Sequence, residues 1–129
     1  MRNAQARVAK RARRLRFEQL VNQVFQTLPG RIQRELDNVD FVVEDEPASR
    51  DSGADDGELF GLYLGTPRNE RDSFYTMTLP DVITLFRGPL ERTFPDPVEL
   101  RLQIRITLLH EIAHHLGIDE EDVTELGLA

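Results

Sequence analysis

Two histidines and a glutamate near the carboxyl end of the chain have the types and spacing for metal chemistry. His110 and His114 lie four residues apart, and Glu111 directly follows the first histidine. Residues four apart share one face of a helix, so both imidazoles can reach one ion, at about 2.0–2.1 Å for zinc. Glu111 can then accept a proton from water at that ion and pass it to a leaving amine. The spacing therefore predicts a Zn²⁺ site with Glu111 as general base.

A third protein ligand is needed, because a catalytic zinc ion usually takes three side chains and a water. Gly117 lets the chain turn after the helix, which brings an acid just beyond it back toward the ion. Glu120 lies ten residues after His110, the position of the third ligand in enzymes with the HExxHxxGxx spacing. Asp119 is the alternative, although it also fits a helix N-cap with Asp122 as its partner. We favour Glu120 and keep Asp119 open.

His115 adjoins the second candidate ligand but points elsewhere. One residue turns a helical side chain by about 100 degrees, which takes His115 off the face shared by His110 and His114. We therefore expect His115 to pack or to support a ligand. The alternative for the whole motif is a buried helix with hydrogen-bonded histidines, because a five-residue pattern alone is a weak signal. All three histidines of the chain cluster here, before Gly117 and an acidic pair, which favours a metal site.

The helix that carries the motif is predicted from its ends and its apolar residues. Asp96 can cap it, and Pro97 fits its first turn, where a missing backbone N–H does no harm. Gly117 should end it. Apolar side chains cover so much of its surface that we expect burial on more than one side. These side chains are Val98, Leu102, Ile106, Leu109, Ile112, Ala113 and Leu116.

The remaining elements follow from the spacing of apolar residues. An amphipathic helix is predicted at residues 17–28 and ends at Pro29-Gly30, and short helices are predicted at 31–38 and 119–126. Apolar runs between turn residues predict strands at 39–43, 59–64 and 82–86, with a short extra strand at 74–77. A polar loop should span 44–58. Together these elements predict a small α+β domain.

Charge is distributed unevenly along the 129 residues. The first 16 hold seven of the 16 basic residues and no acid, so the rest has nine basic against 23 acidic residues, a balance of −14. We expect residues 1–16 to form a flexible basic arm and residues 17–129 to form one domain. The acidic domain should repel nucleic acid, whereas the arm could contact nucleic acid or pack back on the domain.

The composition also limits the classes of protein. The chain has no cysteine, which excludes disulfides and cysteine-ligated metal sites, so any metal must be held by His, Asp or Glu. No stretch approaches the about 18 apolar residues of a membrane span, and the basic start lacks the apolar core of a secretory signal. The sequence therefore predicts a cytoplasmic protein with no membrane partner.

Two segments resemble the small bacterial zincin-like metallopeptidases, also called minizincins. They are HEIAHHLGIDE, from His110 to Glu120, and ITLFRGPL at residues 83–90, and the likeness extends over residues 17–128. The resemblance implies a minimal α+β scaffold with a small mixed sheet and an edge strand beside the active-site helix. That edge strand would begin at Val82 and end at Arg87, where an extended peptide substrate could pair with it.

The resemblance also implies roles for the motif residues. His110 and His114 would be metal ligands, Glu111 the general base, and one acid of the Asp119–Glu120 pair the third ligand. Together with the motif, it predicts a zinc-dependent peptidase, although fold analogy does not establish activity. Two other functions stay open. The chain could be a non-catalytic interaction module that a metal stabilises, or a nucleic-acid-associated protein that acts through the basic arm.

Overall fold

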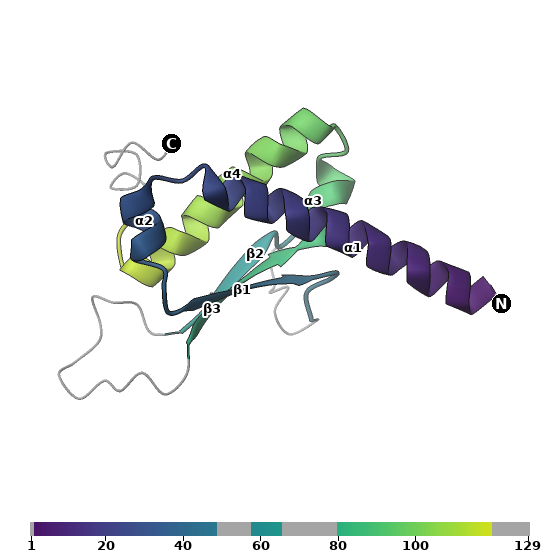
Figure 1. Ribbon diagram of the computed structural model, residues 1–129, viewed down its shortest axis with the longest axis horizontal. Helices are drawn as coiled ribbons and strands as arrows, with labels where there is room; N and C mark the ends of the chain where they lie inside the picture. Colours follow the sequence, from purple (N-terminus) through teal and green to yellow (C-terminus); the bar gives the residue numbers. More distant parts are fainter. Residues whose placement is uncertain (1, 49–57, 66–79, 120–129) are drawn as a thin grey trace.

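Helices and a small sheet make up the fold. The computed structural model describes residues 2–48, 58–65 and 80–119. Its elements, labelled in Figure 1, are α1 (Arg2–Gln26), α2 (Gly30–Arg34), β1 (Val39–Glu44), β2 (Gly61–Leu64), β3 (Asp81–Phe86), α3 (Arg87–Thr93) and α4 (Pro97–Leu116). This architecture confirms the predicted α+β fold class. In the part of the chain that the structure describes, no helix is long and apolar enough to cross a membrane.

Within residues 2–48, 58–65 and 80–119 the sheet has three strands, and β3 lies in the middle. β3 pairs in parallel with β1 and antiparallel with β2, so the order is β1-β3-β2. The prediction that the segment from Val82 to Arg87 forms an edge strand is therefore wrong. Every residue of β3 except Val82 is buried, which is typical of a strand with neighbours on both sides and cover on both faces. Arg87 begins α3 instead of continuing the strand. The edge strand beside α4 is β2.

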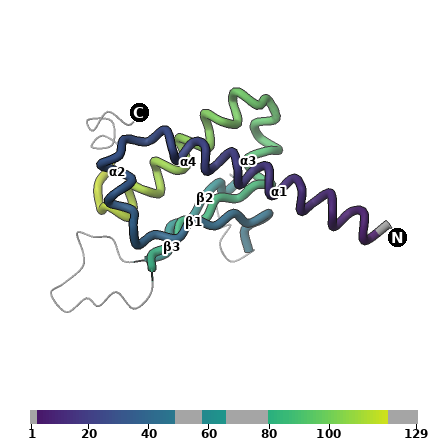
Figure 2. The backbone as a smooth tube through the Cα atoms, in the orientation of Figure 1, coloured from purple at the N-terminus to yellow at the C-terminus, as the bar shows by residue number. Residues whose placement is uncertain are grey.

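α1 and α4 pack against each other above one face of the sheet, as Figures 1 and 2 show. α4 also contacts β2 and β3. The fully buried large side chains come from the sheet and from α1, α3 and α4, and include Val24, Ile83, Leu85, Leu90, Ile104, Leu108 and Ile112. Three of these side chains lie four residues apart on α4. The core therefore fixes one side of α4 against the sheet along most of its length.

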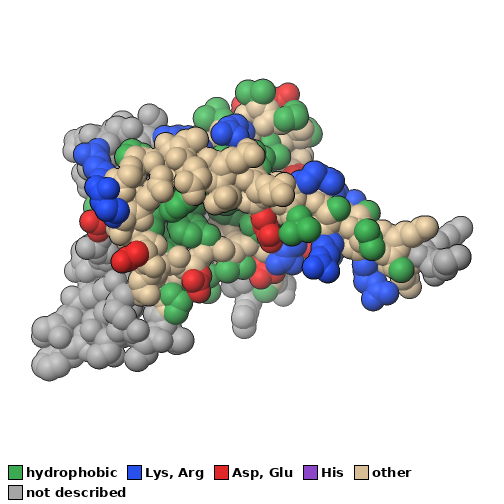
Figure 3. All heavy atoms as spheres, in the orientation of Figure 1, with side chains coloured by type: hydrophobic (Ala, Val, Ile, Leu, Met, Phe, Trp, Pro, Cys, Tyr) green, Lys and Arg blue, Asp and Glu red, His purple; other side chains and the backbone are tan. Residues whose placement is uncertain are grey.

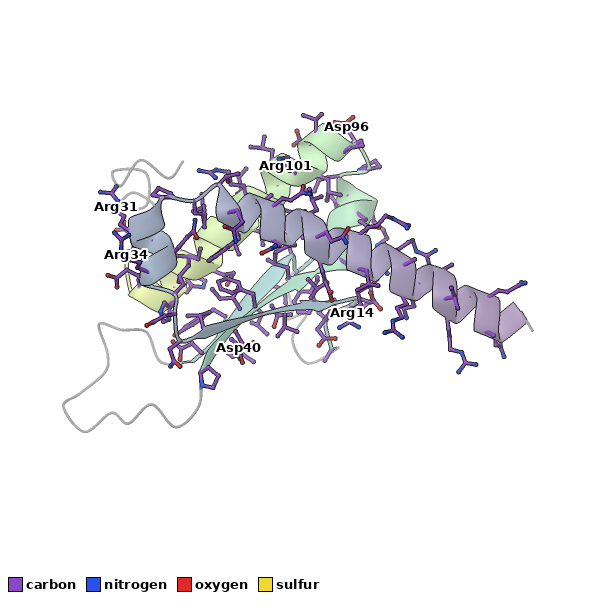
Figure 4. The ribbon with its side chains drawn as sticks, viewed as in Figure 1. Arg14, Arg31, Arg34, Asp40, Asp96 and Arg101 are labelled. Atoms are coloured by element: carbon purple, nitrogen blue, oxygen red, sulfur yellow. The ribbon has the colours of Figure 1, made fainter. Side chains whose placement is uncertain are left out.

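α4 begins and ends where its sequence predicted. The Asp96 carboxylate accepts a hydrogen bond from the Glu99 backbone N–H at 3.0 Å, and Pro97 occupies the first turn (Figure 4). Gly117 has a φ of 72° and a ψ of 31°, a left-handed conformation that glycine adopts without a steric penalty. The helix therefore ends just after the histidine motif.

Burial of α4 is more one-sided than its sequence predicted. Val98 is 79% exposed, Leu102 is 50% exposed and Ile106 is 49% exposed. These three side chains lie four residues apart, so they form one ridge that points away from the core. His110 and His114 continue the same ridge toward the end of the helix. The expectation that Val98, Leu102 and Ile106 are buried is wrong, because α1 and the sheet cover the other side of α4.

α1 is longer than predicted, since it begins at Arg2 instead of at residue 17. Residues 2–16 consist mainly of alanine, arginine and lysine, which have high helix propensity. Arg14 donates a hydrogen bond to the Val43 carbonyl at 2.7 Å, and Lys10 lies 3.4 Å from the Asp45 carboxylate (Figure 4). In Figure 3 the end of α1 projects from the body and carries Lys and Arg side chains. The division into arm and domain stays a prediction, while the helix start is corrected.

The structure confirms some of the other predicted elements. The strands predicted at 39–43, 59–64 and 82–86 correspond to β1, β2 and β3. α2 ends at Arg34, four residues earlier than predicted, and turns follow it. Three predicted elements lie wholly or mostly outside the described residues. They are the loop at 44–58, the extra strand at 74–77 and the helix at 119–126.

Leu108 and Leu102 allow a matched test of the orientation of α4. Leu108 is 0% exposed and Leu102 is 50% exposed. Leu108→Ala should lower the free energy of unfolding by about 2–5 kcal/mol, because it removes buried methyl groups and leaves a cavity. Leu102→Ala should change that free energy by about 0.5 kcal/mol or less. Urea denaturation of both variants measures the two values. Equal losses would contradict the orientation.

Candidate metal centre

The last turns of α4 bring His110, Glu111 and His114 together. One ligand atom from each of these side chains lies within 4.8 Å of those of the other two. The two imidazole centroids are 4.6 Å apart, with an angle of 66° between the rings. Both histidines are exposed, whereas Glu111 is buried. The predicted four-residue spacing thus places two accessible nitrogen donors beside one sheltered carboxylate.

One carboxylate oxygen of Glu111 is buried and lacks a hydrogen bond among the described residues. Its side chain is only 5% exposed, and Oε2 has no hydrogen-bond partner in the described part of the chain. His114 Nδ1 lies 3.3 Å from this oxygen, close enough for an ion pair but without hydrogen-bond geometry. Burial raises the pKa of the Glu111 carboxyl, and the nearby His114 and His110 act in the opposite direction. A sheltered, unsatisfied carboxylate beside two histidines suits a proton acceptor at a metal site.

Gly61 allows β2 to lie close to the candidate metal centre on α4. A Cβ at Gly61 would lie 2.8 Å from Thr107 Cγ2 and 3.3 Å from Glu111 Cγ. The strand can therefore lie this close to α4 only because residue 61 has no side chain. Gly61 was not predicted from the sequence, although a glycine within a predicted strand is a known signal of close backbone approach.

His115 lies off the ligand face, as the helical geometry predicted. It is 3% exposed, and its Nδ1 lies 2.7 Å from Oδ2 of Asp81, which is itself 2% exposed. The Tyr63 hydroxyl donates a hydrogen bond to the same Asp81 oxygen at 2.7 Å. The Tyr63 ring centroid is 6.4 Å from that of His114 and 6.0 Å from that of His115. Tyr63 and Asp81 were not among the residues predicted from the sequence, because no local pattern marks them.

The identity of the third ligand stays a prediction. Glu120 lies outside the described residues. Asp119 is described and exposed, but it does not belong to the His110, Glu111 and His114 group. Two imidazoles with a carboxylate nearby form a nitrogen and oxygen donor set that suits zinc. The side chains present therefore fit the predicted ion.

Comparisons with known proteins cover most of the chain. A family model described as zincin-like metallopeptidase matches residues 36–128, which include the whole motif and exclude α1. No curated protein matches. Among solved structures, a conserved hypothetical protein from Thermo thermophilus has a TM-score of 0.55 and 23% identity, over 85% of this chain and 95% of that chain. At this identity, the likeness shows a shared fold alone.

Separate replacement of the two candidate acids will identify the third ligand. Glu120→Ala should weaken zinc binding by more than about 100-fold, because even the hydrogen-bond partners of ligands contribute about 10–100-fold. Asp119→Ala should leave the zinc dissociation constant unchanged. Competition with a chromophoric chelator measures both constants. The reverse pattern would make Asp119 the ligand, and unchanged binding in both variants would exclude the pair.

Proposed function

The chain belongs to the zincin-like metallopeptidase family, and we propose that it is a zinc-dependent peptidase with His110, His114 and Glu120 as ligands and Glu111 as general base. The observation that carries this proposal is the difference in solvent exposure among three side chains within about one turn of α4. Two histidines are exposed, while the carboxylate between them is buried with one oxygen unsatisfied. This arrangement supports metal-assisted hydrolysis better than a structural helix, whose buried polar atoms are normally paired.

Glu111 performs the proton transfers in this proposal. A bound zinc ion supplies Lewis acidity, which makes water a nucleophile at neutral pH and polarises a carbonyl group. The Glu111 carboxylate accepts the proton that the attacking water loses and delivers it to the nitrogen of the leaving amine. Its shelter beneath the histidines limits competing contact with solvent, and its neighbour Gly61 keeps β2 close to the reacting groups.

An extended peptide along the outer edge of β2 is the substrate geometry that we propose. Phe86 N–H donates to the Phe60 carbonyl at 2.9 Å, and Gly61 lies opposite Leu85 in the antiparallel register. Backbone groups alternate in direction along such a strand, so those of Phe60 and Leu62 point to β3 and those of Gly61 point to the outer edge. A Cβ at Gly61 would lie 3.3 Å from Glu111 Cγ, so this part of the strand lies next to Glu111. A peptide that pairs with this edge would therefore pass directly beside the general base.

The main rival is a non-catalytic module in which the ion joins α4 to the segment that follows it. Such a module uses the same ligands but has no need for Glu111. Only the peptidase function therefore requires the Glu111 carboxylate.

Glu111→Gln separates catalysis from metal binding. The amide cannot accept the proton, so hydrolysis of a fluorogenic peptide library should fall by about 10²–10⁴-fold. Zinc content by mass spectrometry should stay at the wild-type value. Glu99→Gln, the same change at the other end of α4, should alter neither. Retained hydrolysis in Glu111→Gln would eliminate the peptidase mechanism, and loss of zinc would show that Glu111 is a ligand.

A second candidate function, association with nucleic acid, is supported by α1. Arg7, Arg11, Arg13 and Arg16 are exposed on this helix, which carries no acid before Glu18. Guanidinium groups bind phosphates in two-pronged fashion. The family match begins after α1, so this function would be an addition to the metal site.

Salt dependence tests this second function. A variant with Arg7, Arg11, Arg13 and Arg16 all changed to glutamine should bind a mixed-sequence DNA duplex more weakly. The slope of log K against log salt concentration should become less steep by about 0.9 for each phosphate that the variant no longer neutralises. Arg34→Gln with Arg101→Gln, on the body of the molecule (Figure 4), should leave the slope unchanged. An unchanged slope in the α1 variant would exclude the helix as the binding surface.

A further inference from the structure

Asp81 joins three elements that are far apart in the sequence. It is the first residue of the central strand β3 and is 2% exposed. Its Oδ2 accepts a hydrogen bond from the Tyr63 hydroxyl of β2, and His115 Nδ1 of α4 lies at the same distance of 2.7 Å. A carboxylate is an acceptor only, so the imidazole nitrogen donates to it. One oxygen therefore links the edge strand, the central strand and the helix of the metal centre.

The surroundings of Asp81 make this link hard to replace. A buried carboxylate is costly unless hydrogen bonds satisfy it, so loss of either donor leaves an expensive group behind. A Cβ at Gly65 would collide with the Asp81 carboxylate, so the chain passes directly over it where β2 ends. Asp81 is enclosed, and its two partners are held in fixed directions.

β2 depends on such a link more than the other strands do. It has four residues, and among the described strands it pairs with β3 alone, which places it at an edge of the sheet. A short strand with one neighbour has few backbone hydrogen bonds to hold it. The side-chain bond from Tyr63 adds a second attachment, in the same strand that brings Gly61 against Glu111.

We propose that Asp81 is a positioning residue for the metal centre. It holds Tyr63 and His115 at once, and thereby fixes β2 against the last turn of α4. His115 directly follows the ligand candidate His114, so its hydrogen bond sets the rotation of the turn that carries that ligand. Asp81 acts through the hydrogen bonds that it shares with Tyr63 and His115 in the described part of the chain. The effect on the metal rests on the proposed function, whereas the effect on β2 does not.

Two measurements on Asp81→Asn test this role. In metal-free protein, amide hydrogen exchange at Leu62 and Leu64 should become about tenfold faster or more, because β2 loses its side-chain attachment. Cobalt(II), used as a visible probe of the site, should bind about 10–100-fold more weakly and with an altered absorption spectrum. Tyr63→Phe should speed exchange in β2 with a smaller effect on cobalt.

Two control variants separate positioning from general stability. Leu90→Ala removes a fully buried side chain of α3, so it should destabilise the fold while leaving the cobalt spectrum unchanged. Asp40→Asn, on the exposed face of β1, should change nothing (Figure 4). If Asp81→Asn speeds exchange in β2 no more than Leu90→Ala at equal stability loss, the proposal is overturned. If wild type binds no cobalt, the proposed peptidase function fails, and exchange in β2 still decides the role of Asp81.

Discussion

The close approach of β2 to α4 is the constraint on which the candidate metal centre depends. Gly61 lies where any side chain would meet Thr107 and Glu111. A residue with a Cβ would push the strand outward or force α4 to shift, because packed interiors absorb extra atoms poorly. In either case the sheet edge would move away from the buried carboxylate. One missing side chain therefore sets the distance between the edge of the sheet and the catalytic candidate.

α4 places its acid and its histidines in different environments by rotation alone. His110 and His114 continue an exposed ridge of the helix, while Glu111 and His115 are each turned by about 100 degrees from the residue before them and face the interior. A helix buried on all sides would have enclosed the imidazoles and blocked access to an ion. The exposed Val98, Leu102 and Ile106 are the visible consequence of the same one-sided packing. The burial of α4 on one side, which the sequence did not predict, is therefore needed to keep His110 and His114 exposed.

Local features were predictable from the sequence, and non-local ones were not. The ends of α4 depend on Asp96, Pro97 and Gly117, which act within one turn, and the structure has them as predicted. The central place of β3 depends on pairing with strands that precede it by many residues, so an apolar run alone did not distinguish edge from centre. The resemblance to a family supplied the edge strand but attached it to the wrong segment. The continuous burial of β3, which agrees with its central place, becomes apparent only once the strands are paired.

An edge strand that lines an open site faces two opposing requirements. In the proposed function its outer side pairs with a peptide, so a further strand cannot stabilise it there, and with four residues it has a short ladder with β3 on the inner side. The stability of β2 must then come from side-chain hydrogen bonds and from packing of one face of the strand against α4. Gly61 provides contact with α4, and Tyr63 provides a hydrogen bond to a carboxylate that His115 also holds. Buried polar groups are costly in a core this small, and their retention at Asp81 is understandable because an apolar residue there could hold neither partner in a fixed direction. In this proposal the hydrogen bonds to Asp81 attach β2 to β3 and α4 without using its outer backbone edge.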